Sequence, residues 1–207
     1  MDDERLRRHL EAAGVPVKCL EWTWDRLSIE SGNASAVARA RKYVEDHEWR
    51  TGRGLVIMGP VGVGKSTLAA LILTDAGREM VGVRFADSEA LVAEREKTAE
   101  AYAPYLYRAA MNVTLLVIDD MAWHWYREDA EGKRVIRREL EANAERRRME
   151  NLLVGRESRQ LGTIITSNVP RDDLLAVIGA RPASRIQEIC DLVVIGGLDR
   201  RNKWNKE

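Results

Sequence analysis

One segment of nine residues constrains the fold of this chain more than any other, because Gly59 to Thr67 reads GPVGVGKST. It follows the apolar residues Leu55–Met58, which are typical of a buried strand, and it precedes a helical pattern at Leu68–Leu73. A strand, a G-x-x-x-x-G-K-[ST] loop and a helix in this order predict a P-loop. Glycines let successive backbone N–H groups surround a polyphosphate, and the positive end of the helix faces the same anion. The sequence therefore predicts a site for a nucleoside triphosphate.

The residues of this loop have separate expected roles. We expect Lys65 to bind the β- and γ-phosphates as a flexible cation. Ser66 is expected to offer its hydroxyl to Mg²⁺, a cation that prefers oxygen ligands. The expected ligand is thus ATP with Mg²⁺, and the expected nucleotide-binding residues are Gly59, Pro60, Val61, Gly62, Val63, Gly64, Lys65, Ser66 and Thr67.

The composition is that of a globular protein, with 207 residues, 45% hydrophobic residues and 32% charged residues. No run of about 18 apolar residues occurs, so we expect no membrane span. The N-terminus lacks the apolar region of a secretory signal, and a need for cellular ATP favours the cytoplasm. The formal net charge is +0, which argues mildly against a dedicated DNA-binding module.

Strands and helices alternate along the chain, which predicts an α/β sandwich around a parallel sheet. Five strands are expected, at residues 55–58, 81–86, 113–118, 162–167 and 192–195. A heavily charged helix is expected over residues 131–150. These elements form a core that we expect to span residues 51–207.

Residues 1–50 are expected to form helices ahead of this core. The segment 2–13 places Leu6, Leu10 and Ala13 on one face and is followed by Gly14, which predicts an amphipathic helix. Two interpretations remain open for it. The helix either packs on its own domain or docks onto a partner protein.

Polar side chains follow the third and fourth predicted strands. The carboxyl ends of parallel strands form the edge of the sheet where ligands of open α/β folds bind. At the third strand we expect Asp119 to hold Mg²⁺, directly or through a water, and Asp120 to polarise the attacking water. The alternative is that the paired aspartates only start a turn. After the fourth strand we expect Asn168 to bind the γ-phosphate or the water, or alternatively to cap the helix that follows Pro170.

Arg185 lies in the segment Ser184–Ile186, on a short predicted helix. A guanidinium that keeps its charge suits stabilisation of a transition state from a neighbouring subunit. The alternative is an ordinary solvated surface residue.

Basic and aromatic clusters raise the question of nucleic acid binding. The residues expected on the 131–150 helix are Lys133, Arg134, Arg137, Arg138, Arg146, Arg147 and Arg148. Glutamates are interleaved with them, so they indicate either a phosphate-binding stripe or a salt-bridged solvent face. A second basic group near the C-terminus is expected to be a frayed tail. The segment Trp123–Tyr126 is either a hydrophobic flap or an aromatic platform for a partner or single-stranded DNA.

The order of these motifs resembles that of AAA+ ATPases, and more narrowly the DnaC-type helicase loaders, with IstB-type transposition ATPases as relatives. The matching segments are Gly59–Thr67, Leu115–Asp120, Thr163–Asn168, Ser184–Ile186 and Gly196–Arg200. The resemblance spans roughly residues 15–201 and implies ATP hydrolysis, with Asn168 as the sensor I residue and Arg185 as an arginine finger acting in trans. It also implies the AAA+ strand order and head-to-tail assembly into a homo-oligomer.

The chain departs from that family pattern in two places. Little or no C-terminal helical lid with a sensor II arginine is expected after the fifth strand, and Arg200 or Arg201 could partly substitute for that arginine. The region before the core is also short for a separate helicase-binding domain. Contact with a helicase would therefore use residues 2–13 or another surface.

The function implied by the resemblance is that of an ATP-dependent helicase loader in DNA replication. Such a protein binds ATP and Mg²⁺, assembles on single-stranded DNA and delivers or opens a replicative helicase ring. One alternative is a transposition ATPase that acts on duplex DNA. A small-molecule kinase with a P-loop is the other, and Thr166–Asn168 and Ser184–Ile186 argue against it.

Overall fold

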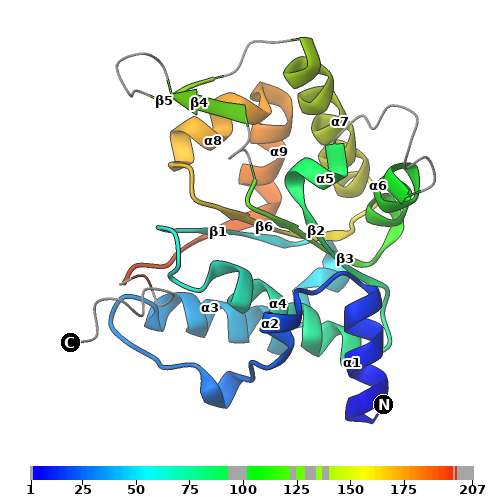
Figure 1. Cartoon of the computed structure of the whole chain (residues 1–207), viewed down its shortest axis with the longest axis vertical. Helices are drawn as coiled ribbons and strands as arrows, with labels where there is room; N and C mark the ends of the chain where they lie inside the picture. Colours follow the sequence, from blue (N-terminus) through cyan, green and yellow to red (C-terminus); the bar gives the residue numbers. More distant parts are fainter. Residues whose placement is uncertain are drawn as a thin grey trace.

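The structure is a computed structural model that describes residues 2–92, 102–121, 125–128, 134–136, 140–197 and 199. A five-stranded parallel sheet in the order β2-β3-β6-β1-β7 runs through its centre, with helices on both faces (Figure 1). Its strands are β1 (Gly54–Met58), β2 (Val83–Asp87), β3 (Leu115–Asp119), β6 (Gly162–Ser167) and β7 (Cys190–Val194). The predicted fold class, a P-loop sandwich of the AAA+ type, is confirmed.

The helices form two layers (Figure 1). One layer contains α1 (Asp3–Ala12), α2 (Val17–Leu20), α3 (Ala34–Glu45) and α4 (Lys65–Arg78), with the short 3-10 turns η1 (Trp24–Arg26) and η2 (Glu48–Thr51). The other contains α5 (Ser88–Val92), α6 (Tyr102–Asn112), α7 (Leu140–Glu157), α8 (Arg171–Ile178) and α9 (Ala180–Ile189).

Side chains of each central strand alternate between two hydrophobic cores. In β1, Leu55 and Ile57 join the core beneath the sheet, whereas Val56 and Met58 join the core above it. Because both faces are covered, the strand is apolar throughout rather than alternating with polar residues. This explains why the strands appear in the sequence as short continuous apolar runs.

The N-terminal helix α1 is built into this fold. Leu6 and Leu10 are buried, and a Cβ at Gly77 of α4 would already lie 3.3 Å from Leu10 Cδ2. The backbone N–H of Phe85 in β2 donates to the carbonyl of Ala13 at 2.8 Å. The apolar face of α1 therefore packs on its own domain, and a docking role is left to the exposed charged side, where it stays a prediction.

The helix predicted over residues 131–150 is wrong in its first half. Strand β5 (Arg134–Ile136) pairs antiparallel with β4 (Tyr126–Glu128), and α7 begins only at Leu140 and continues to Glu157. Residues 137–139 and Lys133 lie outside the described residues. A hairpin depends on pairing with a separate segment, which a charged, helix-like composition does not reveal. Arg134 is thus not on one helix with Arg146–Arg148, so these residues do not form a stripe along a single helix, which was one of the two interpretations left open.

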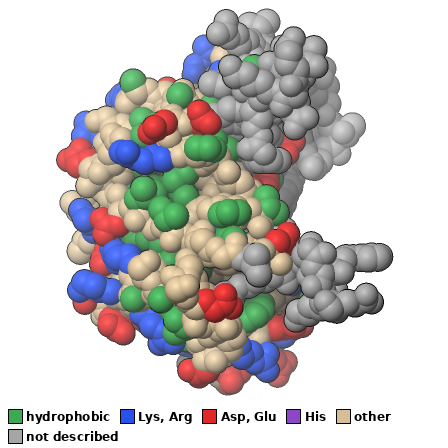
Figure 2. Space-filling view, turned by 90° about the vertical axis from the view of Figure 1, so that its left-hand side faces the viewer, with side chains coloured by type: hydrophobic (Ala, Val, Ile, Leu, Met, Phe, Trp, Pro, Cys, Tyr) green, Lys and Arg blue, Asp and Glu red, His purple; other side chains and the backbone are tan. Residues whose placement is uncertain are grey.

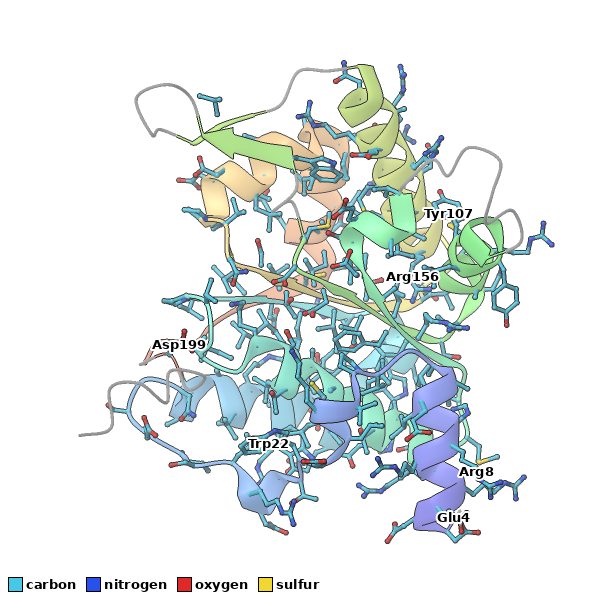
Figure 3. All side chains as sticks on the ribbon, in the orientation of Figure 1. Glu4, Arg8, Trp22, Tyr107, Arg156 and Asp199 are labelled. Carbon is cyan, nitrogen blue, oxygen red and sulfur yellow. The ribbon has the colours of Figure 1, made fainter. Side chains whose placement is uncertain are left out.

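A buried arginine connects the helix layer of α5 to α9 with the sheet through hydrogen bonds. Arg156, near the end of α7, is 0% exposed and lies between the sheet and the helices above it (Figure 3). Its guanidinium donates to the carbonyls of Ala110 at 2.5 Å, Val113 at 2.9 Å and Gly162 at 2.6 Å, and to Thr163 Oγ1 at 3.0 Å. No carboxylate pairs with it among the described residues. Burial lowers the pKa of Arg156 to about 9, which still leaves it protonated at neutral pH.

No helix within the described ranges is long and apolar enough to cross a membrane.

We expect Arg156→Met to lower the free energy of unfolding by about 2–4 kcal/mol, because buried carbonyls would lose their donor. Urea denaturation measures this loss. Arg159→Met is the matched control, since Arg159 lies one turn away and is exposed, with bonds to Gly155 and Asn112. If Arg156→Met lowered the free energy of unfolding no more than the control does, the stabilising role of Arg156 would be contradicted.

Candidate nucleotide-binding site

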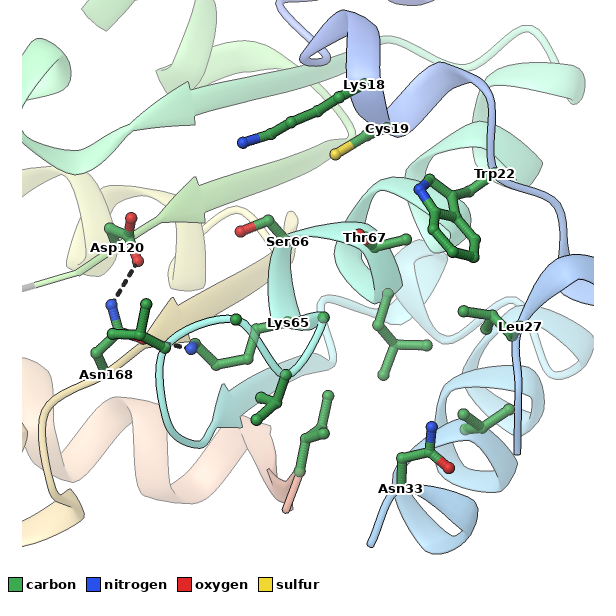
Figure 4. A pocket seen from close by; sticks show the side chains of 17 residues that line it. Lys18, Cys19, Trp22, Leu27, Asn33, Lys65, Ser66, Thr67, Asp120 and Asn168 are labelled. Atoms are coloured by element: carbon green, nitrogen blue, oxygen red, sulfur yellow. Dashed lines mark hydrogen bonds between the residues drawn. The ribbon is translucent and has the colours of Figure 1, made fainter. Parts of the chain in front are cut away.

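A cavity of about 410 Å³ lies at the carboxyl end of the sheet, over the P-loop (Figure 4). On one side it is lined by the loop from Val61 to Thr67, and at one end by Asp120 and Asn168. The opposite wall comes from the N-terminal segment and includes Lys18, Cys19, Trp22, Leu27, Asn33 and Val37. The structure thus brings together the loop and the two strand ends that the sequence predicted.

The loop has the backbone conformation that its glycines allow. Gly62 and Gly64 have φ values of 81° and 104°, in the left-handed region that favours glycine. Helix α4 begins at Lys65, and no side chain at its N-cap accepts a hydrogen bond from the first backbone N–H groups of the helix. A helix end of this sort is a ready site for an anion such as phosphate.

Asp199 packs directly on this loop. A Cβ at Gly62 would lie only 1.7 Å from Asp199 Oδ1, so a larger residue at position 62 would require the Asp199 side chain to move. Figure 3 places Asp199 beside the loop, on the side where the chain leaves β7. The φ of 81° therefore remains the main reason for glycine at position 62.

The ammonium group of Lys65 lies inside the cavity wall. The residue is 5% exposed, and its Nζ donates to the carbonyls of Gly59 at 2.9 Å and Pro60 at 2.7 Å. It also donates to Oδ1 of Asn168. The P-loop cation is therefore held at the end of β6, close to the residue expected to act as sensor I.

The carboxylate of Asp119 is held by two hydroxyl groups. Its Oδ1 accepts from Ser66 Oγ at 2.9 Å and from Thr166 Oγ1 at 2.5 Å. Burial raises the pKa of Asp119 above its usual value, although the two hydrogen bonds act in the opposite direction. Ser66 and Asp119 thus present oxygen donors side by side, which fits a Mg²⁺ ion that keeps waters and binds phosphate oxygens. No cluster of three or more potential metal-ligating side chains occurs among the described residues.

Hydrogen bonds hold the backbone N–H, the backbone carbonyl and the carboxylate of Asp120. Its backbone has a φ of 51°, which aspartate tolerates better than most residues. Its N–H donates to Thr166 Oγ1 at 3.0 Å, and its carbonyl accepts from Ser88 Oγ at 3.0 Å. Its Oδ1 accepts from Asn168 Nδ2 at 3.0 Å (Figure 4). The carboxylate is therefore oriented toward the cavity that it lines.

Asn168 bridges Lys65 and Asp120 and does not cap the following helix. Helix α8 has Pro170 at its N-cap, without a capping hydrogen bond from a side chain. The alternative interpretation of Asn168 as a helix cap is therefore wrong. Its role at the γ-phosphate stays a prediction that this geometry supports.

Thr166 is a site residue to which the sequence analysis gave no role of its own. It binds both Asp119 and Asp120 because β3 and β6 are adjacent, with Ile118 opposite Ile165. Its position two residues before Asn168, on a strand predicted to lie in the same sheet, was the available signal. The sequence analysis also missed the part of the cavity wall that contains Trp22 and Leu27, because these residues belong to an irregular segment with no recognisable pattern.

Arg185 does not reach the cavity of its own chain. It lies on α9 with its side chain 47% exposed, and it pairs with Glu188 at 3.2 Å and with Glu157 at 3.9 Å. Its action on a neighbouring subunit stays a prediction. Arg200 and Arg201, the expected substitutes for a sensor II arginine, lie outside the described residues.

The aromatic segment after β3 is described only from Trp125 onward. Trp125 is buried in the upper core, and its indole Nε1 donates to Glu145 Oε2 at 3.0 Å. This residue therefore behaves as part of a hydrophobic cover. Trp123 and His124 lie outside the described residues, so a platform for DNA or a partner stays a prediction for them.

Comparison with known proteins agrees with this geometry. A family model described as IstB-like ATP binding protein matches residues 2–181. The crystal structure of the DnaC helicase loader has a TM-score of 0.68 and 21% identity, covering 87% of this chain and 99% of that chain. The crystal structure of DnaI has a TM-score of 0.68 and 22% identity, covering 90% and 94% of the two chains.

A structure of the replication initiator DnaA bound to AMPPCP and single-stranded DNA is also similar. Its TM-score is 0.63 at 17% identity, and the match covers 87% of this chain and 50% of that chain. At these identities the structural matches show a shared fold. A search of curated protein sequences found no match.

We expect Thr166→Val to reduce the turnover of ATP by about 10- to 100-fold, because both aspartates lose a hydrogen bond of about 1–3 kcal/mol. Steady-state kinetics measure this loss, and nucleotide affinity in the absence of Mg²⁺ should change little. Thr74→Val is the control, since the Thr74 hydroxyl binds only the Ala70 carbonyl of its own helix. Normal turnover in Thr166→Val would contradict the role of this hydroxyl.

Proposed function

Because the chain belongs to the IstB-like ATP-binding protein family and is an ATPase of the AAA+ type, we propose that it is an ATP-dependent helicase loader in DNA replication. In this proposal it assembles on single-stranded DNA and delivers or opens a replicative helicase ring. The DnaC helicase loader and DnaI support it, since the shared fold covers 99% and 94% of their chains.

The described cavity supplies one subunit's share of the hydrolytic site. Lys65 and the loop N–H groups bind the phosphates, and Asp120, oriented by Asn168, polarises the attacking water. Ser66 and Asp119 are the residues that would hold Mg²⁺. When bound, this ion offsets charge on the phosphate oxygens.

The position of Arg185 is the observation that supports the proposed assembly of subunits. The described residues lining the cavity include lysines but no arginine, whereas Arg185 is exposed on α9, outside the cavity. In this proposal Arg185 completes the site of the next subunit. Such head-to-tail contacts form a ring or a spiral, depending on the rotation between subunits.

Exposed apolar surface supports a partner interface. Leu192 and Val194 on the edge strand β7 are 47% and 60% exposed. Separately, Figure 2 shows the face at the left-hand side of Figure 1, on which hydrophobic side chains gather near the centre, with charged side chains of both signs around them. Apolar patches of this kind are typical of surfaces that another protein covers.

Mixing two inactive variants tests the action of Arg185 in trans. Arg185→Ala and Asp120→Asn should each hydrolyse ATP poorly while still binding it. In an equal mixture about a quarter of the interfaces pair an intact site with an intact arginine, so activity should partly return. Arg181→Ala, an exposed arginine on the same helix, should be active without mixing. Failure of the mixture to recover activity would rule out the trans arrangement.

The native mass of the purified protein tests the helicase-loader function. We expect a shift to an oligomer with ATP, Mg²⁺ and single-stranded DNA, and capture of the replicative helicase in a parallel sample. A chain that stays monomeric with every addition would contradict the proposal.

The family description favours one second candidate, a transposition ATPase that acts on duplex DNA. Competition between single-stranded and duplex DNA at several salt concentrations separates the two functions. Preferential binding to duplex DNA would favour the transposition ATPase.

A further inference from the structure

A second lysine lines the nucleotide cavity from the side opposite the P-loop. Lys18 lies on α2, which packs against α4, and it shares the cavity with Ser66 and Asp120. Figure 4 shows its side chain extended, with the ammonium group directed toward the end of the cavity where Ser66 and Asp120 lie. The sequence analysis assigned no role to this residue.

The backbone that carries Lys18 is anchored. The next residue, Cys19, is buried in the lower core, and its backbone N–H donates to the Pro16 carbonyl at 2.7 Å. The start of the lysine side chain is therefore fixed relative to the P-loop, while its flexible end can adjust to a ligand.

Lys18 differs from Lys42, another exposed lysine of this layer, in forming no ion pair with the described residues. Lys42 on α3 forms an ion pair with Asp46 at 2.5 Å. Lys18 has no hydrogen bond or ion pair with any residue that the structure describes. A flexible cation of this kind gives up no protein partner when it binds an anion.

The charges at this end of the cavity can accommodate a cation in addition to the Mg²⁺ that Ser66 and Asp119 would hold. Asp119 and Asp120 place two carboxylates near Ser66, whereas the ammonium of Lys65 is shared among Gly59, Pro60 and Asn168. No arginine lines the cavity among the described residues. The terminal phosphate of ATP adds further negative charge here, and ADP lacks that group.

We propose that Lys18 determines specificity for the triphosphate by binding the terminal phosphate of ATP in cis. This inference rests on the proposed ATPase site and adds a residue from the N-terminal segment to it. A lysine bound to the terminal phosphate favours ATP over ADP, because only ATP carries the group that it contacts.

Binding of two nucleotides to Lys18→Gln tests the proposal. With Mg²⁺ present, the affinity for a non-hydrolysable ATP analogue should fall about tenfold, as for the loss of one charge-assisted contact. The affinity for ADP should change less than about twofold, and Lys18→Arg should retain most of the preference for the triphosphate. Lys42→Gln is the matched control and should bind both nucleotides as the wild type does.

Each other outcome overturns the assignment. Equal losses for the analogue and for ADP would place Lys18 away from the terminal phosphate, and no loss would make it a solvated surface lysine. Lys65→Ala separates this result from a failure of the ATPase site itself. If the wild type does not bind ATP, or binds it no better than Lys65→Ala, the proposed function fails before Lys18 is tested.

Discussion

The parallel pairing of β3 with β6 is the contact on which the candidate site depends. It places Thr166 beside Asp119, so that one hydroxyl binds the Asp119 carboxylate and the Asp120 N–H. The same register brings Asn168 within reach of Asp120. Because side chains alternate along a strand, a slip of one residue would turn Thr166 away from both aspartates.

Burial gives this small polar network its rigidity. Asp119 lies beneath the cavity, with its carboxylate satisfied by hydroxyl groups from two different elements, α4 and β6. Buried polar groups are costly unless they are hydrogen-bonded, so each partner restricts the others. Asp120 is held in a left-handed conformation by the same surroundings, with a φ of 51°. Backbone strain of this kind persists only where neighbouring contacts over-determine it, and it is common at functional sites.

The helix layers on the two faces of the sheet contribute different parts of the proposed ATPase site. Beneath it, α1, α2, α3 and α4 pack into one core, and α2, α3 and the segment between them form the wall opposite the P-loop. Above it, Arg156 joins α6, α7 and β6 through backbone carbonyls, and α9 presents Arg185 to solvent. The cavity therefore lies between a fixed N-terminal wall and a loop of the sheet. Arg185, the proposed arginine finger, lies exposed on α9 outside the cavity of its own chain.

Local patterns in the sequence were enough to predict the P-loop, the five strands and the two aspartates at a strand end. These features depend on neighbouring residues: glycines that permit unusual φ values, and short apolar runs that are buried on both sides. The helix predicted over residues 131–150 was wrong in its first half, because β5 exists only through its pairing with β4, whereas α7 covers residues 140–150. The contact between Asp199 and Gly62 was equally invisible, since it joins residues far apart in the chain.

The sequence by itself thus determined the class of fold and the chemistry of the loop. Only the tertiary structure decided that Thr166 serves both aspartates, that Asn168 contacts Lys65 rather than a helix end, and that Lys18 lies across the cavity from the P-loop. The physical reason is that motif chemistry resides in residue type and local spacing. Strand order and helix packing depend instead on burial of apolar surface summed over the whole chain.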